Sequence, residues 1–228
     1  MIIDMHCHYD MIPNPENYLR HHEAAGDIII GMTNTPSHFE IGISHVRRYD
    51  NIRLSLGFHP QLAEENQSEL TKFSSLLSKT SYVGEIGLDF NRYYISSRDV
   101  QLSSFDYICG CLSGHKKIIS IHSRMAEREV LEILSKYNIA TPIFHWYTGP
   151  LNLIPPIIEL GAYFSINEAM TLSEKGRKII SKIPLNRLLT ESDAPYNRKS
   201  NIIAALNNLH IDNSIIYENF RNIINSIR

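Results

Sequence analysis

The sequence predicts an α/β fold, a (β/α)8 TIM barrel that forms a single domain over residues 1–228. Three observations lead to this prediction. Eight short apolar runs alternate with helical patterns, no linker or low-complexity tract interrupts the alternation, and no G-x-G-x-x-G follows the first run. Regular repetition and the missing glycine motif both disfavour the alternative, an open doubly wound sheet.

Short runs rich in β-branched and apolar residues predict the strands. They cover residues 2–7, 27–32, 53–58, 82–87, 118–122, 142–145, 162–166 and 187–190. Amphipathic stretches with a helical period lie between the strands or close the chain. They include residues 61–79, 126–137 and 213–227.

Single residues predict where several helices begin and end. Ser96 is expected to cap a helix that runs to about Leu112, and Pro36 and Pro150 suit helix starts. Gly161 suits the end of the helix before the seventh strand. These signals agree with the alternation of strands and helices.

The composition is that of a globular chain, with 43% hydrophobic and 20% charged residues. No apolar run approaches the ~18 residues that span a bilayer, and the start does not resemble a secretory signal, so we expect a cytoplasmic protein with no membrane partner. The net charge of −2 does not indicate a nucleic-acid partner by itself. Cys7, Cys109 and Cys111 are too few, and odd in number, for a disulfide framework, and metal binding by them is a minor alternative.

Barrel enzymes place functional side chains at the carboxyl ends of their strands, so the residue that ends each predicted strand is informative. The first run ends in His6-Cys7-His8. Residues two apart in a strand point the same way, which predicts that His6 and His8 face the barrel interior and Cys7 the helices. With 11 histidines in 228 residues, a His-x-His pair arises by chance about half the time, so the pair alone indicates little.

Four more potential ligands lie at or near the carboxyl ends of other predicted strands: Glu85, His122, His145 and Asp193. Glu85 lies in an apolar run, where an unpaired carboxylate is costly to bury, so it needs a basic partner or a metal ion. Each of these residues alone more often has a core or loop role. Together with the two histidines of the first run, they place six potential ligands where a barrel would gather them.

The six side chains predict a centre for two divalent metal ions. Imidazole and carboxylate ligands suit Zn²⁺ or Mn²⁺, and Mg²⁺ becomes suitable if substrate phosphate oxygens complete its shell. Glu85 is expected to bridge the ions, and Asp193 to accept the proton of the attacking water. The predicted ligands of one ion are His6, His8 and Asp193, and those of the other are His122 and His145.

A series of motifs runs through nearly the whole chain in order. It comprises Asp4-Met5-His6-Cys7-His8, Gly57-Phe58-His59-Pro60, Gly84-Glu85-Ile86-Gly87-Leu88-Asp89-Phe90, Arg98 with Gln101 and Phe105, His122-Ser123-Arg124, His145-Trp146-Tyr147-Thr148-Gly149, Gly161-Ala162-Tyr163-Phe164-Ser165 and Glu191-Ser192-Asp193-Ala194-Pro195. This series resembles the TatD family of metal-dependent deoxyribonucleases, within the amidohydrolase superfamily.

The resemblance implies a barrel of the metal-dependent hydrolase type, two divalent metal ions, and hydrolysis of DNA phosphodiesters as a 3′-to-5′ exonuclease acting on single strands or 3′ ends. The ligand positions of the family fall on the same six residues. A substrate role for His59 and Arg124 is also implied. For Arg124 the alternative is a salt bridge with Glu191.

Independently of the resemblance, predicted loops at strand ends combine aromatic and basic side chains, as base stacking and phosphate attraction require. They contain Arg92, Tyr93 and Tyr94; Trp146 and Tyr147; and Tyr196, Arg198 and Lys199. Trp146 is the predicted substrate contact among them. The alternative is ordinary loop solubility with partly buried rings.

The chain departs from the family pattern without losing a ligand. Gln61 stands where a second histidine is frequent, and Trp146-Tyr147 replaces a more usual Cys-Phe. The compact chain and the Trp-Tyr pair resemble the TatD-like members of bacterial Qat anti-phage systems, which implies a defence role with partner proteins. Two alternatives are hydrolysis of a small amide, lactone or phosphoester, and a scaffold role in a defence complex. Glu85 disfavours the first, because related barrels often carry a modified lysine there, and the full ligand set disfavours the second.

Overall fold

The computed structural model describes residues 1–139 and 141–227 and contains all eight predicted strands. They are β1 Ile3–Cys7, β2 Ile28–Gly31, β3 Ile52–Leu54, β4 Tyr82–Gly87, β5 Ile118–His122, β6 Pro142–His145, β7 Tyr163–Ile166 and β8 Leu188–Thr190. All paired strands are parallel, in two sheets with the orders β1-β2-β3 and β4-β5-β6-β7-β8. Strand order therefore follows chain order, as the predicted α/β fold of the TIM-barrel type requires.

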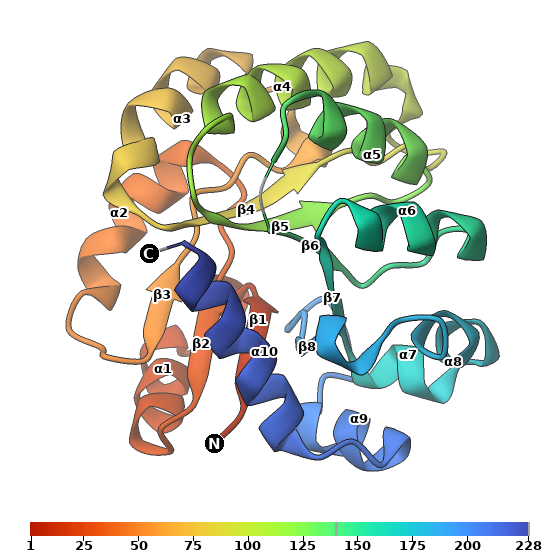
Figure 1. Ribbon diagram of the computed structural model, residues 1–228. Helices are drawn as coiled ribbons and strands as arrows, with labels where there is room; N and C mark the ends of the chain where they lie inside the picture. Colours follow the sequence, from red (N-terminus) through yellow and green to blue (C-terminus); the bar gives the residue numbers. More distant parts are fainter. Residues whose placement is uncertain (140, 228) are drawn as a thin grey trace.

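Backbone hydrogen bonds join the two sheets at both seams. Between β3 and β4, the amide of Leu56 donates to the carbonyl of Tyr82 at 3.0 Å, and Phe58 donates to Glu85 at 2.9 Å. Between β8 and β1, the amide of Asp193 donates to the carbonyl of His6 at 2.9 Å. The strands accordingly follow one another around a common centre (Figure 1).

Ten α-helices of the described residues surround the strands (Figure 1). They are α1 Pro15–Ala24, α2 Pro36–Val46, α3 Leu70–Leu76, α4 Arg98–Leu112, α5 Glu127–Lys136, α6 Ile154–Glu159, α7 Glu168–Leu172, α8 Glu174–Ile180, α9 Ile202–Leu209 and α10 Asn213–Ser226. Within the described ranges, no helix has the length and apolar character that crossing a bilayer requires.

Most predicted helix boundaries are confirmed, and two predicted helix starts are corrected. Pro36 is the first residue of α2, and Gly161 follows α6 with a φ of 92°, which glycine adopts readily. The cap at Ser96 is wrong, because α4 begins at Arg98 after a 3-10 turn over Ile95–Ser97. Pro150 likewise precedes a 3-10 turn, and α6 begins only at Ile154.

The predicted helix over 61–79 is instead a series of 3-10 turns followed by the short α3. Polar side chains explain the interruption, because they compete for backbone carbonyls. Asn66 donates to the carbonyl of Leu62 at 2.8 Å, and Gln67 donates to that of Ala63 at 2.7 Å. This irregular segment brings Gln61 to the carboxyl end of the strands.

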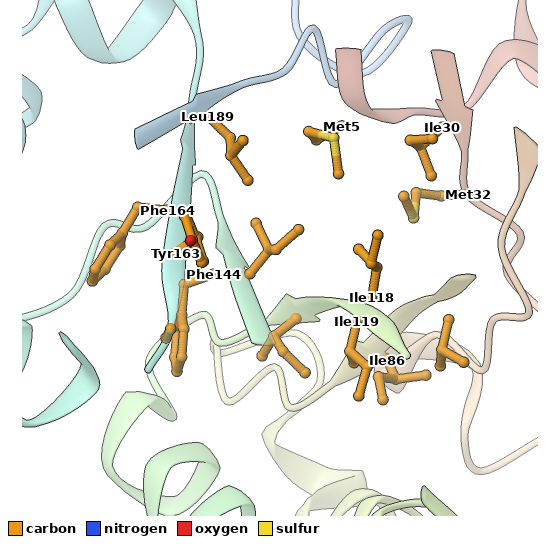
Figure 2. Close-up of a cluster of buried hydrophobic side chains, with 14 of the residues drawn as sticks. Met5, Ile30, Met32, Ile86, Ile118, Ile119, Phe144, Tyr163, Phe164 and Leu189 are labelled. Atoms are coloured by element: carbon orange, nitrogen blue, oxygen red, sulfur yellow. The ribbon is translucent and has the colours of Figure 1, made fainter. Parts of the chain in front are cut away.

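Buried apolar side chains from strands all around the fold form the core. Figure 2 shows Met5 of β1, Ile30 of β2, Ile86 of β4, Phe144 of β6 and Leu189 of β8, and each is at most 1% exposed. Burying one such side chain stabilises a fold by roughly 1.5–3 kcal/mol. The polar residues at the strand ends are thus supported by a well-packed apolar core.

The cysteines contribute to this packing as free thiols, as predicted. Cys7 and Cys109 are buried, and Cys111 is half-buried. The Sγ atom of Cys7 lies 3.5 Å from the hydroxyl of Tyr18 on α1, so this side chain faces the helices as the strand period predicted.

Candidate metal centre

The side chains predicted as ligands meet at the carboxyl ends of the strands, around a hollow of about 590 Å³. His8, Glu85, His122, His145 and Asp193 line it, and His6 lies directly beneath, with no exposed surface. Three sets of donor atoms in this region each lie within 4.8 Å of one another. The sets are His6, His8 and Asp193; His6, Glu85 and His145; and His59, Glu85 and His122.

Glu85 is the centre of the cluster. One carboxylate oxygen, Oε2, lies 3.2 Å from the Nε2 atom of His8 and 3.2 Å from that of His59. The other oxygen, Oε1, lies 2.5 Å from the Nδ1 atom of His122 and 2.8 Å from the Nε2 atom of His145. The Nε2 atom of His6 also lies 3.5 Å from Oε2. Both oxygens therefore face imidazoles, which is the geometry expected of a bridging ligand.

Two glycines of β4 allow the strand to approach its neighbours closely around Glu85. A Cβ atom on Gly84 would lie 2.8 Å from the Met32 sulfur, and one on Gly87 would lie 1.9 Å from the carbonyl oxygen of His122. Both glycines also have positive φ angles, 150° and 140°, which L side chains rarely adopt. The glycines of the Gly-Glu-Ile-Gly pattern thus allow the backbone conformation that places the Glu85 carboxylate.

His6, His8 and Asp193 form what we call the inner group. The two Nε2 atoms of the histidines lie 3.2 Å apart, and the Oδ1 atom of Asp193 lies 3.7 Å and 3.9 Å from them. The Nδ1 atom of His6 lies 2.8 Å from the hydroxyl of Ser120, which fixes the orientation of the ring. The predicted convergence of His6 and His8 is confirmed.

His59, Glu85 and His122 form what we call the outer group. Behind it, the Nε2 atom of His122 lies 3.0 Å from the Oδ2 atom of Asp89, and the same oxygen accepts a hydrogen bond of 2.7 Å from Gln61. Such a carboxylate behind a histidine selects the tautomer whose other nitrogen can bind a metal ion. Here the free nitrogen, Nδ1, is the one that faces Glu85.

His145 stands between the two groups and does not pair with His122 alone. The Nε2 atom lies 3.3 Å from the Nδ1 atom of His122, and the ring stacks on that of His6 with centroids 3.9 Å apart. On the far side, the Nδ1 atom lies 3.8 Å from Glu191. His145 can therefore contribute to either group.

The electrostatics of the cluster follow from burial and from the facing charges. Burial alone would raise the pKa of Glu85, but the imidazoles of His59 and His145 hold that pKa well below its usual value. Burial lowers the pKa of His6, which favours the neutral imidazole with a free lone pair. Burial also raises the pKa of Asp193 to about 7, against the opposing effect of His145.

The donor set fits divalent metal ions. Imidazole nitrogens and carboxylate oxygens are the ligands that Zn²⁺ and Mn²⁺ accept, and Glu85 supplies a buried negative charge that nearby cations would compensate. The Nε2 atoms of His6 and His8 lie 3.2 Å apart, and both face the carboxylates of Glu85 and Asp193. These are the properties of a site in which metal ions replace protons between the side chains.

The predicted substrate contacts all line the hollow, but not with equal roles. Arg124 is exposed and Trp146 is half-buried at the rim, whereas His59 belongs to the outer group. The alternative salt bridge from Arg124 to Glu191 is wrong. Glu191 is fully buried and accepts hydrogen bonds from Ser165 and from Asn167 instead.

Some lining residues were missed or misjudged from the sequence. Tyr147 is wrong as a rim residue, because its ring is 1% exposed and its hydroxyl donates to the carbonyl of Pro150. Asn34 and Gln61 line the hollow but were not predicted as site residues. The position of Asn34, two residues after the predicted second strand, was the available signal.

The fold and the site together define a class of protein, an α/β barrel-type hydrolase with a histidine-carboxylate metal centre. Residues 3–218 match the model of a family described as TatD related DNase. The chain therefore belongs to the TatD family, and it is a metal-dependent hydrolase.

Curated relatives support this family assignment. An uncharacterized metal-dependent hydrolase of Buchnera aphidicola is 30% identical over 220 residues, which covers 86% of this chain and 81% of the relative. The protein named deoxyribonuclease Tat-D of Schizosaccharomyces pombe is 28% identical over 173 residues. That match covers 69% of this chain and 55% of the yeast protein.

Solved structures show the same fold. YJJV, a TatD homologue from Escherichia coli K12, superposes with a TM-score of 0.82 at 22% identity, covering 99% of this chain and 97% of its own. A TatD family hydrolase from Entamoeba histolytica gives a TM-score of 0.75 at 18% identity, with 97% of both chains covered.

Proposed function

We propose that this hydrolase cleaves DNA phosphodiester bonds with two divalent metal ions, as an exonuclease that works 3′ to 5′ from the end of a single strand. The position of Glu85 carries the proposal, because its Oε2 atom lies near His8 of the inner group and its Oε1 atom near His122 of the outer group. One carboxylate can then serve two ions at once. The deoxyribonuclease named among the relatives supports DNA as the substrate.

In this proposal the inner group holds one ion and the outer group holds the other. Bound ions would lower the pKa of a water molecule and offset the charge on the phosphate oxygens. His145 would be a ligand of either ion, since it lies 2.8 Å from the Oε1 atom of Glu85 and stacks on the ring of His6. His59 thereby changes from a predicted substrate contact to a proposed ligand.

The residues around the ions bind the substrate and move the proton. Asp193 accepts the proton of the attacking water at its carboxylate. Arg124 is exposed at the rim, where its guanidinium can pair with a phosphate. Trp146 and Tyr196 line the mouth, where their rings can stack on bases.

The defence role and a cytoplasmic location are the finer parts of the proposal. The defence role rests on the resemblance of the compact chain and its Trp146-Tyr147 pair to the TatD-like members of Qat systems, whereas the location rests on the lack of an apolar run that could span a bilayer. The proposal therefore includes partner proteins of such a system. Loss of phage protection in cells that carry Asp193→Asn in place of the wild-type chain is the expected result, and full protection by that variant would favour a scaffold role.

A digestion assay tests the proposed reaction. A 5′-labelled single-stranded oligonucleotide is incubated with the protein and Mg²⁺, Mn²⁺ or Zn²⁺ in turn, and the products are separated by length. We expect a ladder that shortens from the 3′ end, with a rate about 100- to 10,000-fold lower for Asp193→Asn. The matched control is His45→Ala, which changes an exposed histidine of α2.

Two outcomes would contradict the proposal. Products that shorten from the 5′ end would reverse the polarity while leaving the chemistry intact. DNA that stays intact with all three ions, together with hydrolysis of a cyclic amide or lactone, would assign the centre to a small-molecule substrate.

A further inference from the structure

A second hollow lies beside the metal centre, at the same end of the barrel. It measures about 630 Å³ and shares two lining residues, Arg124 and Thr148, with the first hollow. The loop after β5, the loop after β6 and helix α8 form its walls. Figure 1 shows α5, α6 and α8 following one another along this side of the barrel. The two hollows are therefore neighbours along one surface.

Basic side chains outnumber acidic ones in the second hollow. Arg124, Lys175 and Lys178 line it, and all three are exposed. Glu127 also lines it, but this carboxylate belongs to a residue that is only 9% exposed. Exposed cations in a concave surface attract anions and hold them next to the entrance of the metal centre.

Lys178 stays available although it has a partner. The ammonium lies 2.7 Å from Glu174, and the two side chains are 64% and 77% exposed. A surface ion pair of this kind contributes little stability, and an ammonium has three donors. Lys178 can therefore form a hydrogen bond with a phosphate at a small cost in free energy.

Exposed apolar side chains accompany the cations. Met125 is 66% exposed and Leu151 is 41% exposed, and both line the second hollow. Between them Gly149 forms part of the floor, where a Cβ atom would lie 2.6 Å from the hydroxyl of Tyr147 and from Glu127. Apolar surface beside cations matches the sugars and bases of a nucleic acid that alternate with its phosphates.

We infer that the second hollow is a binding subsite for the phosphodiester backbone of single-stranded DNA whose terminal nucleotide occupies the metal centre. The strand crosses Arg124 and Thr148, which belong to both hollows, and its next phosphates pair with Lys175 and Lys178. This inference rests on the proposed DNase function. It adds that the enzyme prefers an oligonucleotide to a dinucleotide or a small phosphodiester.

The double variant Lys175→Ala with Lys178→Ala tests the subsite in the metal-loaded enzyme. Alanine suits α8, and both lysines are exposed, so we expect a folded protein. Hydrolysis is measured for a single-stranded 12-mer over a range of KCl concentrations, and for bis(p-nitrophenyl) phosphate, which reaches only the metal centre.

For the 12-mer we expect KM to rise about tenfold with little change in kcat, because these lysines bind the substrate away from the reacting phosphate. The slope of log kcat/KM against log salt should become shallower by about 1.4, or about 0.7 for each lost phosphate contact. Rates for bis(p-nitrophenyl) phosphate should stay within twofold of the wild type.

A matched control removes the same charge at the opposite end of the barrel. Lys79 and Lys116 are exposed and precede β4 and β5, so they lie at the amino ends of the strands. The double variant Lys79→Ala with Lys116→Ala should keep the wild-type KM and salt slope. Equal effects of the two double variants would show that net charge, and not a local subsite, determines KM. That result would overturn the inference.

The remaining outcomes separate the inference from the function on which it rests. A wild-type enzyme that digests the 12-mer, with an unchanged KM in the α8 variant, overturns the subsite and leaves the proposed function standing. A wild-type enzyme that leaves the 12-mer intact removes both. A raised KM for bis(p-nitrophenyl) phosphate in the α8 variant would show damage to the metal centre and would also overturn the subsite.

Discussion

The inner and outer groups of the metal centre differ in what holds them in place. His6 and His8 are at most 2% exposed, and a backbone hydrogen bond ties Asp193 to the carbonyl of His6. His59 and His122 are each 13% exposed. The outer group is thus more open to solvent, and Asp89 lies behind its His122.

This difference teaches that burial separates one half of the site from solvent more completely than the other. Asp4 adds to the inner group, because its Oδ1 atom accepts hydrogen bonds from the backbone amides of His6 and Ser192, at 3.2 Å and 2.9 Å. Changing the inner group therefore disturbs the frame, whereas the outer group can be adjusted alone. We expect the ion of the outer group to exchange faster.

The largest expected effect comes from Glu85→Ala, which removes the carboxylate that both groups share. Loss of the buried negative charge should reduce bound metal from two ions to at most one and lower the DNase rate about 1,000-fold or more. Metal content after gel filtration and the digestion rate measure both effects. Glu64→Ala, at an exposed position, is the control. Two retained ions would remove Glu85 as the bridge.

The next effect separates the groups. His8→Ala should lose the ion of the inner group and His122→Ala that of the outer group, so each variant should retain one ion. Each should also lose about 100-fold in rate, because the proposed reaction uses both ions. Titration of each metal-free variant by calorimetry counts the sites. If either variant loses both ions, the two groups act as a single unit.

The smallest effects concern the support of the outer group. Hydrogen bonds from His122 and Gln61 outweigh burial and lower the pKa of Asp89 to about 2, so this carboxylate stays charged behind the histidine. Asp89→Asn should weaken binding of the ion in the outer group about 10- to 100-fold and leave binding of the ion in the inner group unchanged. Gln61→Ala should weaken binding of the ion in the outer group only about threefold, since the contact between Asp89 and His122 remains.

Calorimetric titration with Mn²⁺ resolves the two binding steps in these variants. Asn66→Ala is a control, because its side chain donates to the carbonyl of Leu62 in the same irregular segment without contacting the site. Equal weakening of both ions by Asp89→Asn would contradict the separate support of the outer group.

The inner group was predictable from the sequence because a simple period fixes it. Residues two apart in a strand share a face, so His6 and His8 had to converge once the strand was recognised. Asp193 followed from the rule that functional residues lie at strand ends. These inferences need no knowledge of how distant side chains pack.

The outer group was only partly predictable, because it depends on contacts between distant segments. Gln61 and Asp89 are 28 positions apart, and their hydrogen bond arises from the irregular turns after β3. His59 directly follows the predicted third strand, so the strand-end rule would have marked it as a ligand. Tyr147 was misjudged because its aromatic type does not tell whether a ring lies at the rim or in the core.

The hydrogen bond between Asp193 and His6 joins the segment after the last strand to the first strand. The inner group therefore draws on both ends of the chain and needs 193 of the 228 residues to be present. A chain still being translated lacks this carboxylate until the eighth strand has emerged and docked.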